Sequence, residues 1–229
     1  MGVPDVVPLN LQIVFVLGGP GAGKGTQCTR LAQDYYLQHL SLGDVLRKER
    51  DTPGSEYGEL IARNMEQGRI GPMEVTVSLL RKAILASTVQ TNSRLFLIDG
   101  FPRKMDQLHL FEDTVCAATC AVYLDTSSGD RRRRLINRAV TDGRQDDTDE
   151  IIQKRFVTFE ETCMKVIKHL ECEGRIEKVQ GEGNIDEVYV AIQQALKTRL
   201  GDALASRKAV PPRSTTPETS STTMMESRI

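Results

Sequence analysis

A glycine-rich segment near the N-terminus constrains the fold most. Residues 18–26 read Gly-Gly-Pro-Gly-Ala-Gly-Lys-Gly-Thr, between the apolar run at 13–17 and a helix-like pattern. Glycines allow positive φ angles and a close approach of the backbone to a phosphate, and the following helix adds N–H groups and a favourable dipole. Lys24 would reach the terminal phosphates, and a hydroxyl beyond it would face Mg²⁺. The segment predicts a polyphosphate site formed by Gly21, Ala22, Gly23, Lys24, Gly25 and Thr26.

The spacing at the end of this segment departs from the general pattern. Ser or Thr usually follows the lysine directly, whereas here Gly25 intervenes and Thr26 stands one place later. An ordinary glycine-rich turn is the alternative interpretation. A strand, the Gly-x4-Gly-Lys pattern and a helix occur here in the expected order, which argues against an ordinary turn. The displaced Thr26 narrows the set of phosphate-binding families to which the chain could belong.

Strand-like and helix-like segments alternate along most of the chain. Strands are expected at residues 12–17, 39–41, 94–98, 120–124 and 176–179. A long helix is expected over 148–173, and both the first helix and the last, from Ile185, carry apolar residues at helical spacing. This order predicts an α/β fold with a five-stranded parallel sheet flanked by helices. Ligands of such sheets bind beyond the carboxyl ends of the strands, so we expect functional residues there.

One domain is expected over residues 11–200, between a loose leader at 1–10 and a tail at 201–229. The tail is rich in Ser, Thr and Pro and has few large apolar groups, so burial cannot offset the entropy of ordering it. Its last residues, Ser227-Arg228-Ile229, do not meet the Ser-Lys-Leu pattern of a peroxisomal address.

Charge and cysteine content argue against several classes of protein. Thirty basic and 31 acidic residues give a net charge of −1, which offers no broad cationic surface for nucleic acid. We see no secretory signal and no membrane span, and we expect no membrane partner. The five cysteines have no zinc-type pair spacing. Reduced thiols in a cytoplasmic protein are therefore expected. The nucleus is a second expected location.

An acidic residue and an arginine follow the strand at 94–98. Asp99 and Arg103 should share a crevice with Lys24, because the carboxyl ends of parallel strands meet at one edge of a sheet. A carboxylate beside a phosphate loop suits Mg²⁺ binding through water, and a helix cap or turn is the structural alternative. We assign no metal site formed by protein ligands alone and expect Mg²⁺ to be bound with a nucleotide.

Arginines gather in the later part of the chain, and arginine suits bidentate recognition of phosphate. Arg134 and Arg138 are four residues apart and share a helix face, whereas Arg131 to Arg133 are expected on a solvated helix surface. The polar segment at 139–147, which contains Arg144, has the composition of a mobile flap or of an ordinary loop. Phosphoryl transfer, which needs charge neutralisation and exclusion of water, favours the flap.

Four ordered motifs resemble those of the short-lid nucleoside monophosphate kinases, the adenylate kinase family, over residues 11–200. They are Gly18 to Thr26, Ser41-Leu42-Gly43-Asp44 with Arg47, Asp99-Gly100-Phe101-Pro102-Arg103, and Asp142-Gly143-Arg144-Gln145-Asp146-Asp147. The resemblance implies a fold of the P-loop NTPase type with a helical acceptor-binding insertion at 41–71 and a short lid at 138–147. It also implies a monomer that transfers a phosphoryl group from ATP, with Mg²⁺, to a nucleoside monophosphate.

The resemblance further assigns roles to single residues. The catalytic set it implies is Lys24, Asp99, Arg103, Arg138, Arg144 and Arg155. It places ATP on Gly21 to Thr26, Arg138 and Gly183. The acceptor would meet Arg47, Arg69, Ile70, Gly71, Gly100, Phe101, Pro102, Arg103, Gln107, Arg144 and Arg155. Leu42 and Gly71 depart from the family's usual smaller residue and valine, so we expect a reshaped pocket for the acceptor base.

Gln107 stands where the family places an amide that reads the acceptor base. A primary amide both donates and accepts hydrogen bonds, so it can match a pyrimidine or adenine. The string from Phe101 to Gln107 resembles fungal-type uridylate kinases. We favour UMP and CMP, with dCMP, as acceptors, in pyrimidine nucleotide biosynthesis. AMP remains open as the alternative, and a regulator that binds ATP without transfer is a second one.

Overall fold

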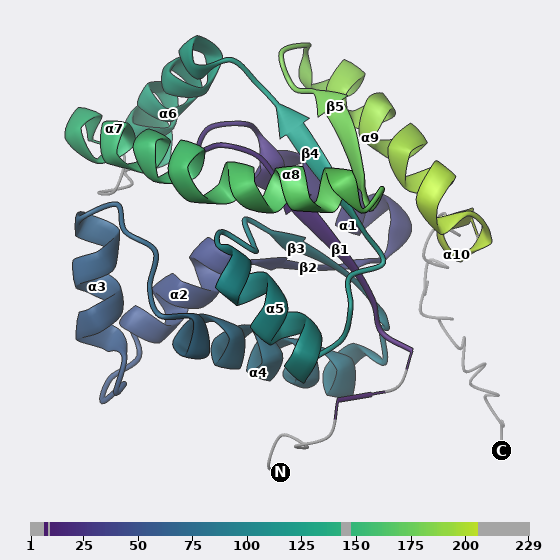
Figure 1. Ribbon diagram of the computed structural model, residues 1–229, viewed down its shortest axis with the longest axis horizontal. Helices are drawn as coiled ribbons and strands as arrows, with labels where there is room; N and C mark the ends of the chain where they lie inside the picture. Colours follow the sequence, from purple (N-terminus) through teal and green to yellow (C-terminus); the bar gives the residue numbers. More distant parts are fainter. Residues whose placement is uncertain (1–6, 9, 143–147, 206–229) are drawn as a thin grey trace, which may run out of the picture.

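The computed structural model describes residues 7, 8, 10–142 and 148–205. Its centre is one parallel sheet in the order β2-β3-β1-β4-β5 (Figure 1). The strands are β1 (Gln12–Leu17), β2 (Gln38–Ser41), β3 (Leu95–Asp99), β4 (Cys120–Asp125) and β5 (Ile176–Gln180). Each lies within one residue of its predicted bounds, and the predicted α/β architecture is confirmed.

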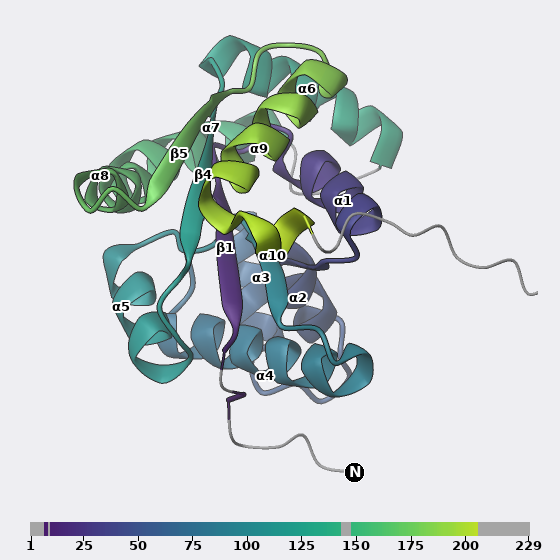
Figure 2. The ribbon, with the colours of Figure 1, turned by 90° about the vertical axis from the view of Figure 1, so that its right-hand side faces the viewer.

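Helices cover both faces of this sheet (Figure 2). They are α1 (Lys24–Tyr35), α2 (Leu42–Arg50), α3 (Gly58–Glu66), α4 (Met73–Thr91), α5 (Met105–Thr114), α6 (Ser128–Asp142), α7 (Asp149–Thr158), α8 (Met164–Cys172), α9 (Ile185–Leu200) and α10 (Asp202–Ala205), with a π-helical segment, η1 (Phe159–Cys163), between α7 and α8. Within the described ranges, no helix is both long and apolar enough to cross a membrane.

The hydrophobic core has two halves, divided by the sheet. Ile13, Phe15 and Leu17 of β1 point into the half covered by α4, α5 and α8. Val14 and Val16 point the other way, toward α1 and α9. Alternation along a strand produces this division, and the burial of β1 on both faces explains its unbroken apolar sequence.

The carboxyl ends of the strands form the edge at which the glycine-rich segment lies. β1 pairs with β3 so that Val16 is opposite Asp99, and β2 pairs with β3 so that Ser41 is opposite Asp99. Three loops that follow these strands therefore meet at one place. The predicted helical insertion is present as α2 and α3, at the same end of the sheet (Figure 1).

Three expectations about the elements need correction. The long helix at 148–173 is interrupted by η1. Ile185, which begins the apolar pattern of the last helix and would accordingly face the core, is 58% exposed at the start of α9, where Asn184 caps the helix. The tail was expected from residue 201, but α10 follows and buries Leu204 in the core half beside α9. Of the proposed lid, residues 138–142 continue α6, and 143–147 lie outside the described residues.

Candidate active site

The phosphate loop joins β1 to α1. Gly21 and Gly23 have φ angles of 83° and 90°, the left-handed region in which side chains are strained. The amide of Ala22 donates to the carbonyl oxygen of Gly19 at 3.1 Å, which closes a tight turn. Helix α1 begins directly at Lys24, so the N–H groups of its first turn face the end of the loop. This geometry is an anion cradle.

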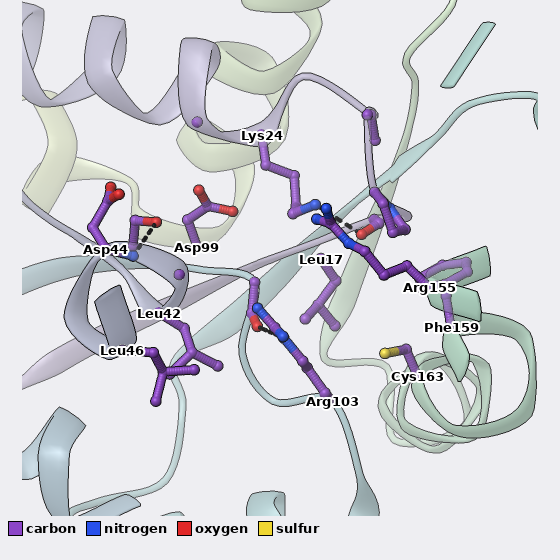
Figure 3. A pocket seen from close by; sticks show the side chains of 18 of the residues that line it. Leu17, Lys24, Leu42, Asp44, Leu46, Asp99, Arg103, Arg155, Phe159 and Cys163 are labelled. Carbon is purple, nitrogen blue, oxygen red and sulfur yellow. Dashed lines mark hydrogen bonds between the residues drawn. The ribbon is translucent and has the colours of Figure 1, made fainter. Parts of the chain in front are cut away.

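Lys24 folds back over the loop (Figure 3). Its ammonium group donates to the carbonyl oxygens of Gly18 at 2.9 Å and Gly19 at 3.1 Å. Burial lowers the pKa of Lys24, the carboxylate of Asp99 opposes that effect, and the nearby guanidinium groups of Arg103 and Arg155 lower it further. Lys24 thus lies in a crowded positive region, where an anionic ligand would stabilise its charged form.

One cleft of about 1110 Å³ runs from the phosphate loop to the helical insertion. It is lined by nearly all of the residues that sequence analysis proposed. Those residues are Gly21, Ala22, Gly23, Lys24, Gly25, Thr26, Arg47, Arg69, Ile70, Gly71, Asp99, Gly100, Pro102, Arg103, Gln107, Arg138, Arg155 and Gly183. The fold therefore brings segments from five parts of the chain to one cavity.

Asp99 ends β3 beside the start of α1. Asp99 is 8% exposed, and a Cβ built on Gly25 would lie 3.5 Å from the Oδ2 atom of Asp99. His39, which sequence analysis did not single out, places its Nε2 3.7 Å from the same oxygen. With no side chain at Gly25, the carboxylate of Asp99 lies against the first turn of α1.

Arg103 is held by the loop that precedes α5. Its Nε donates to the carbonyl oxygen of Gly100 at 2.9 Å, and its backbone N–H donates to Oε1 of Gln107 at 3.0 Å. Gln107 is fully buried, and its Nε2 has no hydrogen-bond partner among the described residues. A backbone N–H requires an acceptor, so this contact fixes the amide with its NH₂ group turned away from Arg103.

The remaining arginines enter from peripheral helices. Arg47 of α2 pairs with Asp44 one turn earlier, and Arg155 projects from α7 toward Lys24 (Figure 3). Arg134, which shares a face of α6 with Arg138, donates to the carbonyl oxygens of Ala22 at 3.4 Å and Gly181 at 2.9 Å. Arg144 lies outside the described residues.

Two side chains do not lie where sequence analysis placed them. Phe101, proposed for acceptor binding, is fully buried in the core and has edge contacts with Phe15 at 5.6 Å between ring centroids. Arg131, expected on a solvated surface, is only 6% exposed, whereas Arg132 and Arg133 are exposed as expected. Four arginines in succession must face different sides of a helix, and only the tertiary structure decides which side is covered.

The cleft also contains residues that carried no sequence signal. Asn64 of α3 and Cys163 of η1 line it. Burial raises the pKa of the Cys163 thiol, which keeps it protonated and unreactive. Both residues lie on helices that sequence analysis treated as packing or as a general acceptor-binding region, and a lone Asn or Cys has no motif to reveal it.

Comparison with known proteins agrees with this geometry. The family model described as adenylate kinase matches residues 16–175. The chain is 45% identical over 197 residues to the uridylate kinase of Saccharomyces cerevisiae, covering 86% of this chain and 96% of the relative. It is 45% identical over 204 residues to the UMP-CMP kinase of Lentinula edodes, with 86% and 90% covered. It is also 41% identical over 186 residues to adenylate kinase 1 of Schistosoma mansoni, with 81% and 93% covered.

Proposed function

Because the chain belongs to the adenylate kinase family, we propose that it transfers the γ-phosphoryl group of ATP reversibly to a pyrimidine nucleoside monophosphate, mainly UMP and CMP. Membership in this family establishes that the protein is a nucleoside monophosphate kinase. What we propose in addition is the base of the nucleotide that accepts the phosphoryl group. The products are ADP and a nucleoside diphosphate, which fits a place in pyrimidine nucleotide biosynthesis. One chain supplies every group named below, so a monomer suffices for the cycle.

The phosphate loop is the proposed donor site. The N–H groups around Gly21 to Thr26 and the ammonium of Lys24 would bind the ATP phosphates, with Gly183 and Arg134 at the nucleoside end of the cleft. Mg²⁺ would neutralise charge on the phosphates, and the fit rests on hard oxygen donors: the hydroxyl of Thr26 and, through water, the buried carboxylate of Asp99.

Arginines would orient the two substrates and balance the moving charge. Arg103, braced by Gly100 and beside Gln107, would hold the acceptor phosphate together with Arg47 from the insertion. Arg155, near Lys24, and Arg138 would neutralise the transferred group. We place Arg144 in the same role by resemblance alone. No general base is required, because positioning and electrostatic stabilisation supply most of the rate in phosphoryl transfer.

The fixed amide of Gln107 presents a hydrogen-bond donor to the base of the acceptor. Its oxygen accepts from the Arg103 N–H, and its NH₂ group is turned away from that contact at the acceptor end of the cleft. A uracil carbonyl oxygen or the ring nitrogen of cytosine accepts this donor, and so does a ring nitrogen of adenine. The names of the uridylate and UMP-CMP kinase relatives are therefore what supports the choice of a pyrimidine.

AMP is the second candidate, favoured by the space at Gly71. A Cβ built there would lie 3.5 Å from Nδ2 of Asn64 and 4.0 Å from Oγ1 of Thr76, so glycine leaves room that a larger residue would fill. The extra room suits a purine ring. The relative named adenylate kinase 1 supports this second candidate as well.

The test is a coupled assay of ADP release with ATP and Mg²⁺, offering UMP, CMP, dCMP, AMP and GMP separately. We expect the highest kcat/KM with UMP or CMP. A higher value with AMP would overturn the pyrimidine assignment. In Gly71→Val, turnover of AMP should fall more than that of UMP, and an equal fall would show that Gly71 does not set the size of the base site.

A further inference from the structure

Arg131 is a buried cation that the proposed chemistry does not use. It lies on α6, three residues before Arg134, but does not line the cleft. Its side chain is 7% exposed, and its Nε and Nη1 have no hydrogen-bond partner among the described residues. Burying a charge with unsatisfied donors costs free energy, so a role in packing alone would favour an apolar residue here.

Arg131 packs against the phosphate loop at Gly19 and Gly21. A Cβ built on Gly21 would lie 2.3 Å from the carbonyl oxygen of Arg131, and one built on Gly19 would lie 1.7 Å from its Nη1. Gly21 also has a positive φ angle, but Gly19 does not. The contact with the Arg131 side chain, rather than the backbone conformation, is therefore what excludes a side chain at Gly19.

Arg131 also contacts the segment that follows Arg155. The centre of its guanidinium lies 4.8 Å from the ring centroid of Phe156 and 5.1 Å from that of Phe159. Its Nη2 is 3.3 Å from Oε1 of Glu160, which is largely exposed. Cation–π contacts with two rings and one ion pair hold the guanidinium in place. Arg131 thus lies between the loop and the helix that carries Arg155.

We propose that Arg131 is a positioning residue that sets the distance between the phosphate loop and the Arg155 helix. The guanidinium is a spacer between them, because it lies against Gly19 of the loop and also against the rings of Phe156 and Phe159. Arg155 and the loop amides must reach the same phosphoryl group, so their separation affects the transition state more than the fold. This proposal rests on the proposed binding of ATP at the loop.

The first test exchanges Arg131 for methionine, which keeps an unbranched stem without the planar charge. We expect Arg131→Met to unfold at the same temperature as wild type or higher, because a buried charge is removed. Its kcat/KM for ATP should fall about tenfold or more, with KM for the acceptor less affected. Arg133→Met, an exposed position on the same helix, is the matched control and should leave both quantities unchanged.

The second test measures coupling between Gly19 and Arg131. Gly19→Ala alone should reduce kcat/KM for ATP by about tenfold, because the methyl group meets Nη1. In an Arg131→Ala background, which removes the obstacle, the added Gly19→Ala change should cost less than about threefold. Thermal unfolding of all four proteins identifies variants that are merely misfolded.

Equal effects of Gly19→Ala in both backgrounds would overturn the proposal, as would a fall in stability of Arg131→Met with unchanged kinetics for ATP. The proposed donor site is tested separately by Lys24→Met. If that variant keeps wild-type turnover, the site assignment fails, whereas absent coupling with a dead Lys24→Met protein refutes only the role of Arg131.

Discussion

The phosphate loop and the helical insertion face each other across one cleft, but they are attached to the fold very differently. The loop follows β1, in which five of six residues are buried. In the insertion, α2 buries only Leu42 and α3 buries only Ile61. Few buried contacts give a segment a low free energy of local opening. We therefore expect the proposed donor half of the site to be fixed and the proposed acceptor half to move.

This difference matches the order of tasks in phosphoryl transfer. A fixed loop can hold a polyphosphate by backbone geometry alone, whereas the acceptor must be enclosed, aligned and released in each cycle. The insertion also contacts α7, the helix that carries Arg155: the hydroxyl of Thr158 on α7 donates to the carbonyl oxygen of Gly68 at 3.1 Å. Closure would thus bring Arg47 and Arg155 toward the same phosphate.

The largest effect is expected from the fixed half. Lys24→Met should reduce kcat by about 10³-fold, because a charge aimed at the transferred phosphate is lost. The unfolding temperature should stay equal or rise, since burial disfavours the lysine charge. Steady-state kinetics measures the change in kcat, and thermal unfolding measures the change in unfolding temperature. Lys82→Met, at an exposed position of α4, is the control, and wild-type turnover in Lys24→Met would contradict the assignment.

A smaller effect is expected at Gln107, where the fixed and movable halves meet. Gln107→Leu removes the base-facing donor and leaves the Arg103 N–H without its acceptor. We expect kcat/KM for UMP to fall by about 10- to 100-fold while KM for ATP is unchanged. Gln194→Leu, exposed on α9, is the control. An equal loss with every acceptor, AMP included, would show that Gln107 supports the Arg103 loop without reading the base.

The movable half should respond to a cavity differently from the core. Ile61→Ala in α3 should raise KM for the acceptor a few-fold with little change in global unfolding, because the insertion opens locally. Leu31→Ala in α1, fully buried in the core, should lower the free energy of unfolding by about 3 kcal/mol. Chemical denaturation measures global unfolding, and hydrogen exchange measures local opening of the insertion. Equal destabilisation by both variants would mean that insertion and core unfold as one unit.

The smallest expected effect is on the pH dependence of stability. Lys24 has a pKa below the ordinary 10.5 in the folded protein, so between these two values the unfolded chain binds more protons. Stability contributed by this group should therefore increase as pH rises through the folded pKa toward 10.5. To isolate the contribution of Lys24, the unfolding free energies of wild type and Lys24→Met are compared across alkaline pH. A constant difference would show that burial does not perturb Lys24.

The fixed half of the site was also the more predictable half. Strand β1, the loop and Asp99 follow from local rules: an apolar run, glycines and a strand end. The insertion was predicted only as a region, through resemblance, because each of its two helices buries a single residue and so leaves few core positions to read. The presence of Asn64 in the cleft depends on how α3 is placed and has no local signal.

Burial on the later helices could not be predicted from composition. Arg131 belongs to a run of charged residues, and charge runs usually lie on solvated faces. Its burial depends on Phe156 and Phe159, which are distant in sequence and approach only after α7 packs against α6. Phe101 was assigned to the site because it stands within a motif, but its ring fills the core beside Phe15. A motif fixes the path of the backbone more firmly than the direction of each side chain.

The π-helical segment Phe159–Cys163 has a consequence for how this chain tolerates changes in length. It separates α7, which carries Arg155, from α8, which is anchored in the core by Val166 and Leu170. A π turn contains one residue more than the α turn it replaces. Deleting a single residue there would let an α turn form in its place and keep α7 in register with α8, whereas deleting one from a regular turn of α8 would rotate α7 by about 100° relative to the core. The π-helical segment is therefore a place where the helix that carries Arg155 can lose a residue without turning Arg155 out of the cleft.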